Sequence, residues 1–132
     1  MKALSLQRDS AITLSVLREA VSRFVGERKW EKFHSPKNIA ESICIEASEL
    51  LEIFQWRTTE ESRALSRNPK NAKRVSQELA DVIIYCLALA NAIQMDMSDA
   101  VLSKLRENSR RYPITRCKGT APRRRNHGGR KT

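Results

Sequence analysis

The stretch IEASELLEIF, residues 45–54, decides the fold, because it has the apolar spacing of an amphipathic helix and carries acids beside its apolar face. At about 100° per residue, Glu46 lies about 20° from Ile39, on the packing side of this helix. Glu49 lies at the edge of that side, and Glu52 points away. The apolar residues on the same side are Ile39, Ile43, Leu50 and Phe54. A charge on a packing surface is costly unless it is compensated, so the Glu46 carboxylate needs a partner.

A second long helix, predicted for residues 72–95, carries the matching pair of acids Glu78 and Asp81. The same projection places Glu78, Asp81 and Tyr85 along one edge of its apolar stripe. That stripe consists of Val75, Leu79, Val82, Ile83, Cys86, Ala90 and Ile93. Antiparallel packing of the two helices would therefore bring both acid pairs together.

Four neighbouring carboxylates repel one another unless they are protonated or neutralised. The alternative for each acid is an ion pair with a surface Lys or Arg, which is the common outcome for a single acid pair on a helix. Two pairs on the inward edges of successive helices favour a shared hard divalent cation with oxygen ligands, and Mg²⁺ is the natural candidate. The predicted ligands are Glu46, Glu49, Glu78 and Asp81.

Capping signals divide the chain into helices. Residues 10–28 are predicted as a first helix, capped by Asp9 or Ser10, with the apolar stripe Ile12, Val16, Leu17, Ala20, Phe24 and Val25. Ser35 before Pro36 opens the second helix, which is expected to reach Trp56. Thr58 and Glu61 match a capping box that opens a short helix ending near Asn68 and Pro69. No convincing strand pattern occurs, so the predicted class is all-α, a bundle of four main helices.

The fourth main helix is expected to begin with Ser98 or Asp99 as its cap and to end before Pro113. Lys104, Asn108 and Arg111 follow one another at helical spacing and form one polar stripe. Such a stripe is more often a solvated face. Opposite a cluster of metal-binding acids it suits the oxygens of a polyphosphate, to which Lys and Arg donate.

Aromatic residues are few, and several lie at helix ends. Trp30 and Phe33 lie in the loop before the second helix with His34, Trp56 ends that helix, and Tyr85 follows Asp81 by one turn. Taken separately, each ring is explained by packing in the core or at an interface. Together they offer faces on which a base can stack.

The net charge of +10 belongs mainly to the C-terminal end. Residues 116–132 hold seven Lys and Arg and no acid, whereas the preceding residues hold 18 basic and 15 acidic residues, which leaves +3. We therefore expect one domain at residues 1–115 and a solvated basic tail at residues 116–132. Contact with nucleic acid is expected, if at all, only through this tail.

Composition narrows the surroundings of the protein. No apolar run approaches the roughly 20 residues that span a bilayer, and no signal peptide is recognised, so no membrane association is expected. Cys44 and Cys86 lie in apolar helical patterns, Cys117 lies in the tail, and there is no CxxC motif. These cysteines are predicted to be small buried residues without metal or disulfide partners, which favours a reducing cytoplasm.

A family resemblance adds to this reading. Five motifs occur in order: WEKFHSPKN (30–38), EASE (46–49), FQW (54–56), ELADVIIY (78–85) and KLRENSRRYP (104–113). Together they resemble the MazG-like all-α nucleoside triphosphate pyrophosphohydrolases, and within them the dCTP pyrophosphatase branch. The resemblance covers about residues 14–113.

The resemblance implies Mg²⁺-dependent hydrolysis of a nucleoside triphosphate, dCTP or a related or modified nucleotide, to the monophosphate and pyrophosphate. It implies an assembly of dimers or dimers of dimers, with pockets completed across subunits. Animal members have a His on the first helix where this chain has Val21, so the resemblance leaves the preferred base open. Residue by residue it implies metal binding by Glu46, Glu49, Glu78 and Asp81, phosphate binding by Lys104, Asn108 and Arg111, and a base and sugar pocket at Trp30, Trp56 and Tyr85, near His34 and Asn38.

Within that function, Glu49 is our candidate for the group that takes a proton from the attacking water, since it lies off the apolar stripe. Lys104 is the candidate that stabilises charge on the phosphates. Two alternatives stay open: a helical phosphohydrolase acting on another nucleotide, and a helical module that binds nucleic acid through the basic tail.

Overall fold

The predicted all-α class is confirmed by the computed structural model, which describes residues 9–120 and contains only helices and connecting turns in this range. The chain divides into two compact units, Met1–Met97 and Ser98–Thr132. The elements in chain order are α1 (Leu14–Glu27), η1 (Glu31–Phe33), α2 (Pro36–Glu52), α3 (Thr59–Ala64), η2 (Leu65–Arg67), α4 (Pro69–Ala92), α5 (Met97–Arg111) and α6 (Ile114–Cys117).

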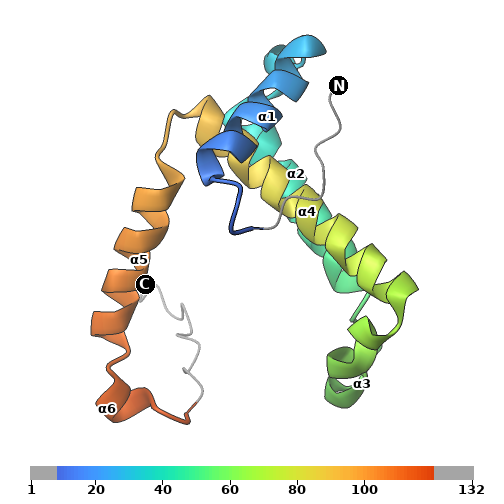
Figure 1. Ribbon diagram of the computed structural model, residues 1–132, viewed down its shortest axis with the longest axis vertical. Coiled ribbons are helices and arrows are strands. Elements are labelled where there is room, and N and C mark those ends of the chain that lie inside the picture. Colours follow the sequence, from blue (N-terminus) through green and yellow to red (C-terminus); the bar gives the residue numbers. More distant parts are fainter. Residues whose placement is uncertain (1–8, 121–132) are drawn as a thin grey trace, which may run out of the picture. The chain divides into compact units, whose positions relative to one another are not determined.

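The antiparallel pair of α2 and α4 forms the frame of the first unit, as Figure 1 shows. Helix α1 packs on α4 near the end where α2 begins. The short segment of α3 and η2 connects the other end of α2 to the start of α4. The predicted antiparallel packing of the two acid-bearing helices is therefore confirmed.

Local capping chemistry explains where α2 and α3 begin. The Ser35 side chain accepts a hydrogen bond from the Asn38 N–H at 3.2 Å, and Pro36 occupies the first helical position. At α3 the predicted capping box is complete, because Thr58 and Glu61 each accept a hydrogen bond from the other's backbone N–H.

Other helix boundaries differ from the predictions. Helix α1 begins at Leu14, since Thr13 supplies the capping hydroxyl in place of Asp9 or Ser10. Helix α4 begins one turn earlier than predicted, because the Asn68 side chain accepts from two backbone N–H groups and Pro69 follows as the first helical residue. Helix α2 ends at Glu52, and a turn carries the chain on to Trp56.

Helix α1 ends in a left-handed turn at Lys29, whose φ is 53°. The Trp30 N–H donates to the Val25 carbonyl at 3.1 Å and the Lys29 N–H to the Gly26 carbonyl at 3.0 Å, the two bonds of a Schellman motif. Helix α4 ends in the same way at Gln94, with φ 54°. Glycine is the usual residue at this position, so both side chains are held at a conformational cost.

The core of the first unit lies where α1 meets the α2–α4 pair. Its buried members are Val21, Ile39, Leu87 and Ala88, with Leu14, Ile43, Tyr85 and Leu89 packed against them. The predicted stripe of helix one missed Val21, whereas Val16, Leu17 and Phe24 from that stripe are more than 40 % exposed. The apolar spacing within α1 does not indicate which side of the helix packs against α4.

Further apolar side chains on the long helices are exposed. They are Ile45 and Leu51 on α2 and Leu79, Ile83 and Ile84 on α4. The prediction that Cys44 is buried is wrong for the single chain, because its side chain is exposed; Cys86 is half-buried, and both are free thiols.

Helix α4 is long and apolar enough, by length and composition alone, to cross a membrane. A single helix of this kind is weak support for a membrane span. Glu78 and Asp81 lie within it, and carboxylates in a membrane-spanning segment are costly. Its packing against α1 and α2 agrees better with a helix of a protein core.

In the second unit, α5 begins at Met97, so the predicted capping residues Ser98 and Asp99 lie inside the helix; it ends at Arg111, before Pro113 as predicted. Helix α6 crosses the predicted boundary at residue 116, so the first residues of the basic tail are helical. The rest of that tail, residues 121–132, lies outside the described residues.

Candidate metal centre

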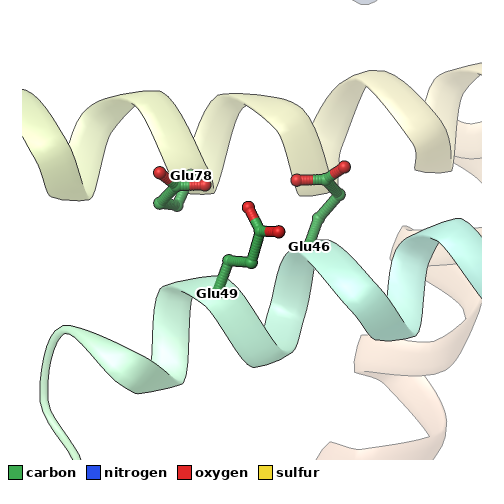
Figure 2. A group of neighbouring side chains, drawn as sticks. All are labelled: Glu46, Glu49 and Glu78. Carbon is green, nitrogen blue, oxygen red and sulfur yellow. The ribbon is translucent and has the colours of Figure 1, made fainter.

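Three predicted metal ligands from two helices meet between α2 and α4. One carboxylate oxygen from each of Glu46, Glu49 and Glu78 lies within 4.8 Å of the other two, as Figure 2 shows. Glu46 and Glu49 are one turn apart on α2, and Glu78 faces them from α4. The projection of the sequence onto two helices is sufficient to explain this arrangement.

Among residues 9–120, no base forms an ion pair with the cluster. The side-chain ion pairs of residues 9–120 are Arg23–Glu19, Arg28–Glu27, Lys37–Glu41 and Lys104–Glu107, none of which includes an acid of the cluster. The ordinary interpretation of surface acids, pairing with Lys or Arg, therefore does not apply to Glu46, Glu49 and Glu78 among these residues.

The fourth predicted ligand, Asp81, interacts electrostatically with the cluster. Burial raises the pKa of Glu46 above its ordinary value of 4.5, and the charges of Glu49, Asp81 and Glu78, in that order, raise it further. Asp81 lies one turn after Glu78, and its exposed side chain is outside the group of three oxygens that lie within 4.8 Å. These mutually repelling carboxylates, of which Glu46 and Glu78 are half-buried, offer the hard oxygen donors that Mg²⁺ prefers, so the residues present fit this ion.

Two of the predicted pocket residues meet near the start of α2. The rings of His34 and Tyr85 lie 6.4 Å apart between centroids. His34 also lines a cavity of about 340 Å³, together with Val21 of α1 and Asn91 of α4. The structure thus places an imidazole, a phenol and a cavity at one end of the acid-bearing helix pair.

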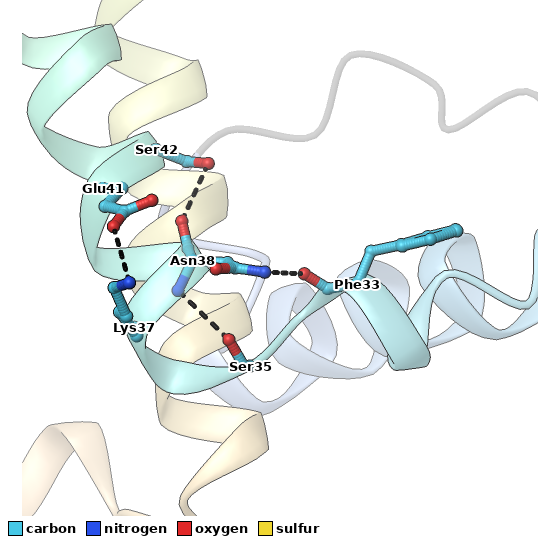
Figure 3. Close-up of polar contacts among 6 residues, drawn as sticks. All are labelled: Phe33, Ser35, Lys37, Asn38, Glu41 and Ser42. Carbon is cyan, nitrogen blue, oxygen red and sulfur yellow. Dashed lines mark hydrogen bonds and ion pairs between the residues drawn. The ribbon is translucent and has the colours of Figure 1, made fainter.

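Asn38 holds the loop that precedes α2, as Figure 3 shows. Its side-chain amide donates to the Phe33 carbonyl at 3.1 Å, and its backbone carbonyl accepts from the Ser42 hydroxyl. The predicted substrate-binding role of Asn38 is untested by these contacts, which show that it fixes the segment carrying His34.

Trp30 has packing partners that the sequence did not reveal. Its ring meets Phe24 edge to face with centroids 5.8 Å apart, and the Arg28 guanidinium lies 3.7 Å from the Phe24 ring centroid. Trp30 is nevertheless 43 % exposed, so part of its ring is available to a ligand.

Trp56 lies at the opposite end of the helix pair from His34 and is 88 % exposed. It borders a second cavity of about 290 Å³, whose lining includes Arg57 and Arg74. These two arginines were not among the predicted site residues.

The predicted phosphate-binding residues all lie on α5, in the second unit. Lys104 Nζ is 2.8 Å from Glu107 Oε2, and the Arg111 guanidinium lies 5.3 Å from the Tyr112 ring centroid. Asn108 is half-buried. Their role in phosphate binding stays a prediction.

A polar link between α1 and α4 was not predicted from the sequence. Arg18 Nε donates to the Asn91 side-chain oxygen at 3.0 Å, and the Asn91 amide donates back to the Arg18 carbonyl at 3.0 Å. The partners are 73 residues apart, a separation that helical periodicity does not connect. Because Asn91 also lines the first cavity, this link fixes one of its walls.

Comparison with known proteins decides the family. A sequence model of the MazG-like family matches residues 41–123, which include all four acids. The chain belongs to the MazG-like family. This MazG-like chain is 38 % identical over 109 residues to dCTP pyrophosphatase 1 from Bos taurus and 42 % identical over 101 residues to dCTP pyrophosphatase 1 from Homo sapiens.

The matches cover 83 % and 76 % of this MazG-like chain, respectively, but only 64 % and 59 % of those two proteins. The chain thus spans less than two thirds of the length of these curated relatives. A solved structure of a pyrophosphatase from Archaeoglobus fulgidus superimposes with a TM-score of 0.71 at 40 % sequence identity, covering 76 % of this chain and 92 % of that one. The resemblance read from the motifs is confirmed at the level of the family.

Proposed function

We propose that this protein is a Mg²⁺-dependent nucleoside triphosphate pyrophosphohydrolase that acts on dCTP or a related or modified nucleotide. The observation that carries this proposal is the cluster of Glu46, Glu49 and Glu78, which has no ion pair with Lys or Arg among the described residues and has Asp81 beside it. The names of the relatives, dCTP pyrophosphatase 1 and a pyrophosphatase, agree with this chemistry. We further expect the protein to work in the cytoplasm, in keeping with its free cysteines.

Glu46, Glu49, Glu78 and Asp81 are the residues that would hold Mg²⁺. When bound, the ion neutralises phosphate oxygens and makes a coordinated water more acidic. Glu49 is exposed at the edge of the cluster and is our candidate for accepting the proton of the attacking water. Lys104, Asn108 and Arg111 would donate to phosphate oxygens, where negative charge grows during attack at the α-phosphorus.

The pocket for the nucleoside requires two chains. Trp30 and His34 precede α2 and Trp56 follows it, so the 17 residues of this helix separate them. At 1.5 Å per residue this is about 25 Å, which is longer than a nucleoside. The rings of Trp30 and Trp56 can therefore converge on one base only if they come from different subunits.

Exposed apolar side chains support the same conclusion. Leu79, Ile83 and Ile84 of α4 are each more than 40 % exposed, and Ile45 and Leu51 of α2 more than 55 %. Burying such side chains against a second copy is favourable. We propose a homodimer or a dimer of dimers, which light scattering would contradict if it gave a mass near 15.1 kDa at micromolar concentration.

The decisive experiment incubates the protein and Mg²⁺ with a panel of common and modified nucleoside triphosphates. Pyrophosphate and orthophosphate are measured separately. We expect stoichiometric pyrophosphate and monophosphate from the preferred nucleotide, and loss of both products on addition of a chelator. Stoichiometric orthophosphate, or neither product across the panel, contradicts the proposal.

Binding of nucleic acid through the basic tail is the second candidate, favoured by seven Lys and Arg without an acid in residues 116–132. Such binding weakens steeply with salt and would vanish when the tail is deleted. Turnover of a nucleotide would survive the same deletion. Retained turnover in the truncated chain thus separates the two activities.

A further inference from the structure

Two aromatic rings and one cation form a stack at the end of α1, made of Phe24, Arg28 and Trp30. The Arg28 guanidinium carbon lies 3.7 Å from the Phe24 ring centroid and 5.9 Å from the Trp30 ring centroid. The two rings meet edge to face, with their centroids 5.8 Å apart and an angle of 76° between their planes. A cation at these distances is attracted by the electrons of an aromatic ring, and most strongly by those of tryptophan. Arg28 therefore interacts with both rings.

The Arg28 side chain is itself held in place. Its Nη1 donates to the Phe24 carbonyl at 3.0 Å and lies 3.7 Å from Glu27 Oε2. Arginines near the end of a helix commonly bind its last carbonyls in this way. The Arg28 backbone N–H also donates to the Val25 carbonyl at 3.2 Å. The guanidinium is thus fixed from its backbone and from its tip, so it can support a neighbouring ring.

The backbone of Trp30 is fixed beside the first cavity. The left-handed turn at Lys29 reverses the chain, and the Trp30 N–H then donates to the Val25 carbonyl at 3.1 Å. Val25 and Glu31, the residue directly after Trp30, both line the cavity of about 340 Å³. Trp30 is therefore connected to two lining residues, one through a hydrogen bond and one through the chain.

The stack is separate from the hydrophobic core. Phe24 is 46 % exposed and Trp30 is 43 % exposed, and neither belongs to the core cluster around Val21 and Ile39. Cation–ring contacts at exposed sites add little to stability compared with the burial of a core side chain. An indole that is both exposed and held in one orientation suits a ligand that stacks on it, because a ring already ordered loses little freedom on binding.

We infer that Arg28 and Phe24 are positioning residues for Trp30, which fix its indole in advance as the flat surface on which the nucleotide base stacks. This inference rests on the proposed function, which supplies the nucleotide. Arg28 acts through the ring and not on the phosphates, so its effect is confined to the nucleoside end of the ligand. Fixing the ring before binding reduces the entropy that is lost when the base is bound.

The test compares a ligand that has a base with one that has none. With the full chain and Mg²⁺, titration calorimetry measures the affinity for inorganic tripolyphosphate and for a monophosphate, either dCMP or the product of the preferred nucleotide of the panel. Arg28→Ala should weaken monophosphate binding by about fivefold, which is less than the roughly tenfold or greater loss expected for Trp30→Ala. Tripolyphosphate affinity should stay at the parent value. In turnover, KM should rise while kcat is kept.

The matched control is Arg23→Ala. This variant removes the same charge from α1, at an exposed arginine that pairs with Glu19 and lies outside the stack. It should bind both ligands as the parent does. A loss of monophosphate affinity in Arg23→Ala equal to that in Arg28→Ala would overturn the inference, since it would show a general effect of charge. An equal loss of tripolyphosphate affinity in Arg28→Ala would overturn it too.

A double-mutant cycle on monophosphate affinity shows whether Arg28 acts through Trp30. Adding Arg28→Ala to Trp30→Ala should cost no further affinity, because the ring that Arg28 supports is already gone. Additive losses would contradict the positioning role. Near-UV circular dichroism provides a readout without ligand: the signal that Trp30→Ala removes should weaken in Arg28→Ala, while the far-UV spectrum and the melting temperature stay close to those of the parent. An unchanged near-UV signal would also count against the inference.

Turnover separates this inference from the proposed function. A parent that releases pyrophosphate while Arg28→Ala keeps the parent's monophosphate affinity retains the function and refutes the positioning role. Monophosphate binding that depends on Arg28 through Trp30, in a chain that releases no pyrophosphate, supports the positioning role and refutes the proposed hydrolysis. A chain that neither binds nor hydrolyses any nucleotide of the panel refutes both.

Discussion

The two ends of the α2–α4 pair differ in what covers them. At the covered end, where α2 begins and α4 finishes, α1 packs on the pair, and Ile39, Leu87 and Ala90 are at most 3 % exposed. At the open end, where α2 finishes and α4 begins, Leu51 is 61 % exposed and Trp56 88 %. The acid cluster lies between them. The covered end therefore supplies the main core cluster, whereas at the open end Ile53 and Leu65 are buried beside these exposed side chains.

The largest expected effect is a loss of turnover when an acid of the cluster, between these two ends, is replaced. Glu46→Ala removes a proposed metal ligand and should lower turnover by at least about a hundredfold. In the metal-free state the variant should melt no lower than the parent, because one of four repelling carboxylates is gone. The control Glu41→Ala removes an exposed α2 acid whose partner is Lys37 and should keep turnover. A metal-free Glu46→Ala variant melting far below the parent would show that Glu46 is structural.

The next effect is on stability at the covered end. Ile39→Ala should lower the free energy of unfolding by about 2–5 kcal/mol, because Ile39 is 2 % exposed and its loss leaves a cavity. Ile83→Ala, on the exposed face of α4, should change the mass distribution of the oligomer while costing the single chain less. Urea unfolding and light scattering measure the two effects. If Ile39→Ala and Ile83→Ala lost the same stability at a concentration where the protein is monomeric, both side chains would be equally buried within the single chain.

A smaller effect concerns pH. The pKa of Glu46 is raised by burial and then by Glu49, Asp81 and Glu78, so the folded chain binds this proton more tightly than the unfolded chain. Ionisation of Glu46 therefore lowers stability as the pH rises from the ordinary value of 4.5 through the raised value. Thermal melts with a chelator should show this decline in the parent and a weaker one in Glu46→Gln. If the parent and Glu46→Gln showed the same dependence of melting temperature on pH, ionisation of Glu46 would not be the cause of the decline.

The smallest effect tests the turn that closes α1 at the covered end. Lys29→Gly should stabilise the chain by about 0.5 kcal/mol, because glycine adopts the left-handed conformation without strain, partly offset by its greater freedom when unfolded. Lys29→Ala keeps the Cβ and should give no such gain. Denaturant midpoints compare the two variants, and a gain of the same size in both would point to the lost charge in place of the backbone.

Local rules predicted much of the fold and part of the site. Facing acids on α2 and α4 follow from helical geometry and antiparallel packing, and both are readable from residue spacing. The caps at Ser35 and Thr58 were predicted because each signal involves residues at most three positions apart. At Asn68 the same type of signal was interpreted as the end of the preceding helix, although it opens α4.

Features that depend on distant contacts were not predictable in this way. Val21 is buried, and Arg18 pairs with Asn91, because α1 lies against the end of α4, more than 70 residues away in sequence. The cavity with Arg57 and Arg74 likewise depends on the turn after α2 approaching the start of α4. The periodicity of apolar residues describes one helix at a time and does not indicate which other helix will pack against it.

The placement of Glu46 and Glu78 on separate helices also has a consequence for chain entropy. A cation shared by them joins residues 46 and 78 and closes a loop of 32 residues that contains α3 and η2. A permanent cross-link of this length would lower the entropy of the unfolded chain and so raise its free energy by about 3–4 kcal/mol at 25 °C. A bound cation would also raise the free energy of the unfolded chain for as long as it links the two residues. Amide hydrogen exchange in the segment from α3 to the start of α4 would then slow on addition of Mg²⁺.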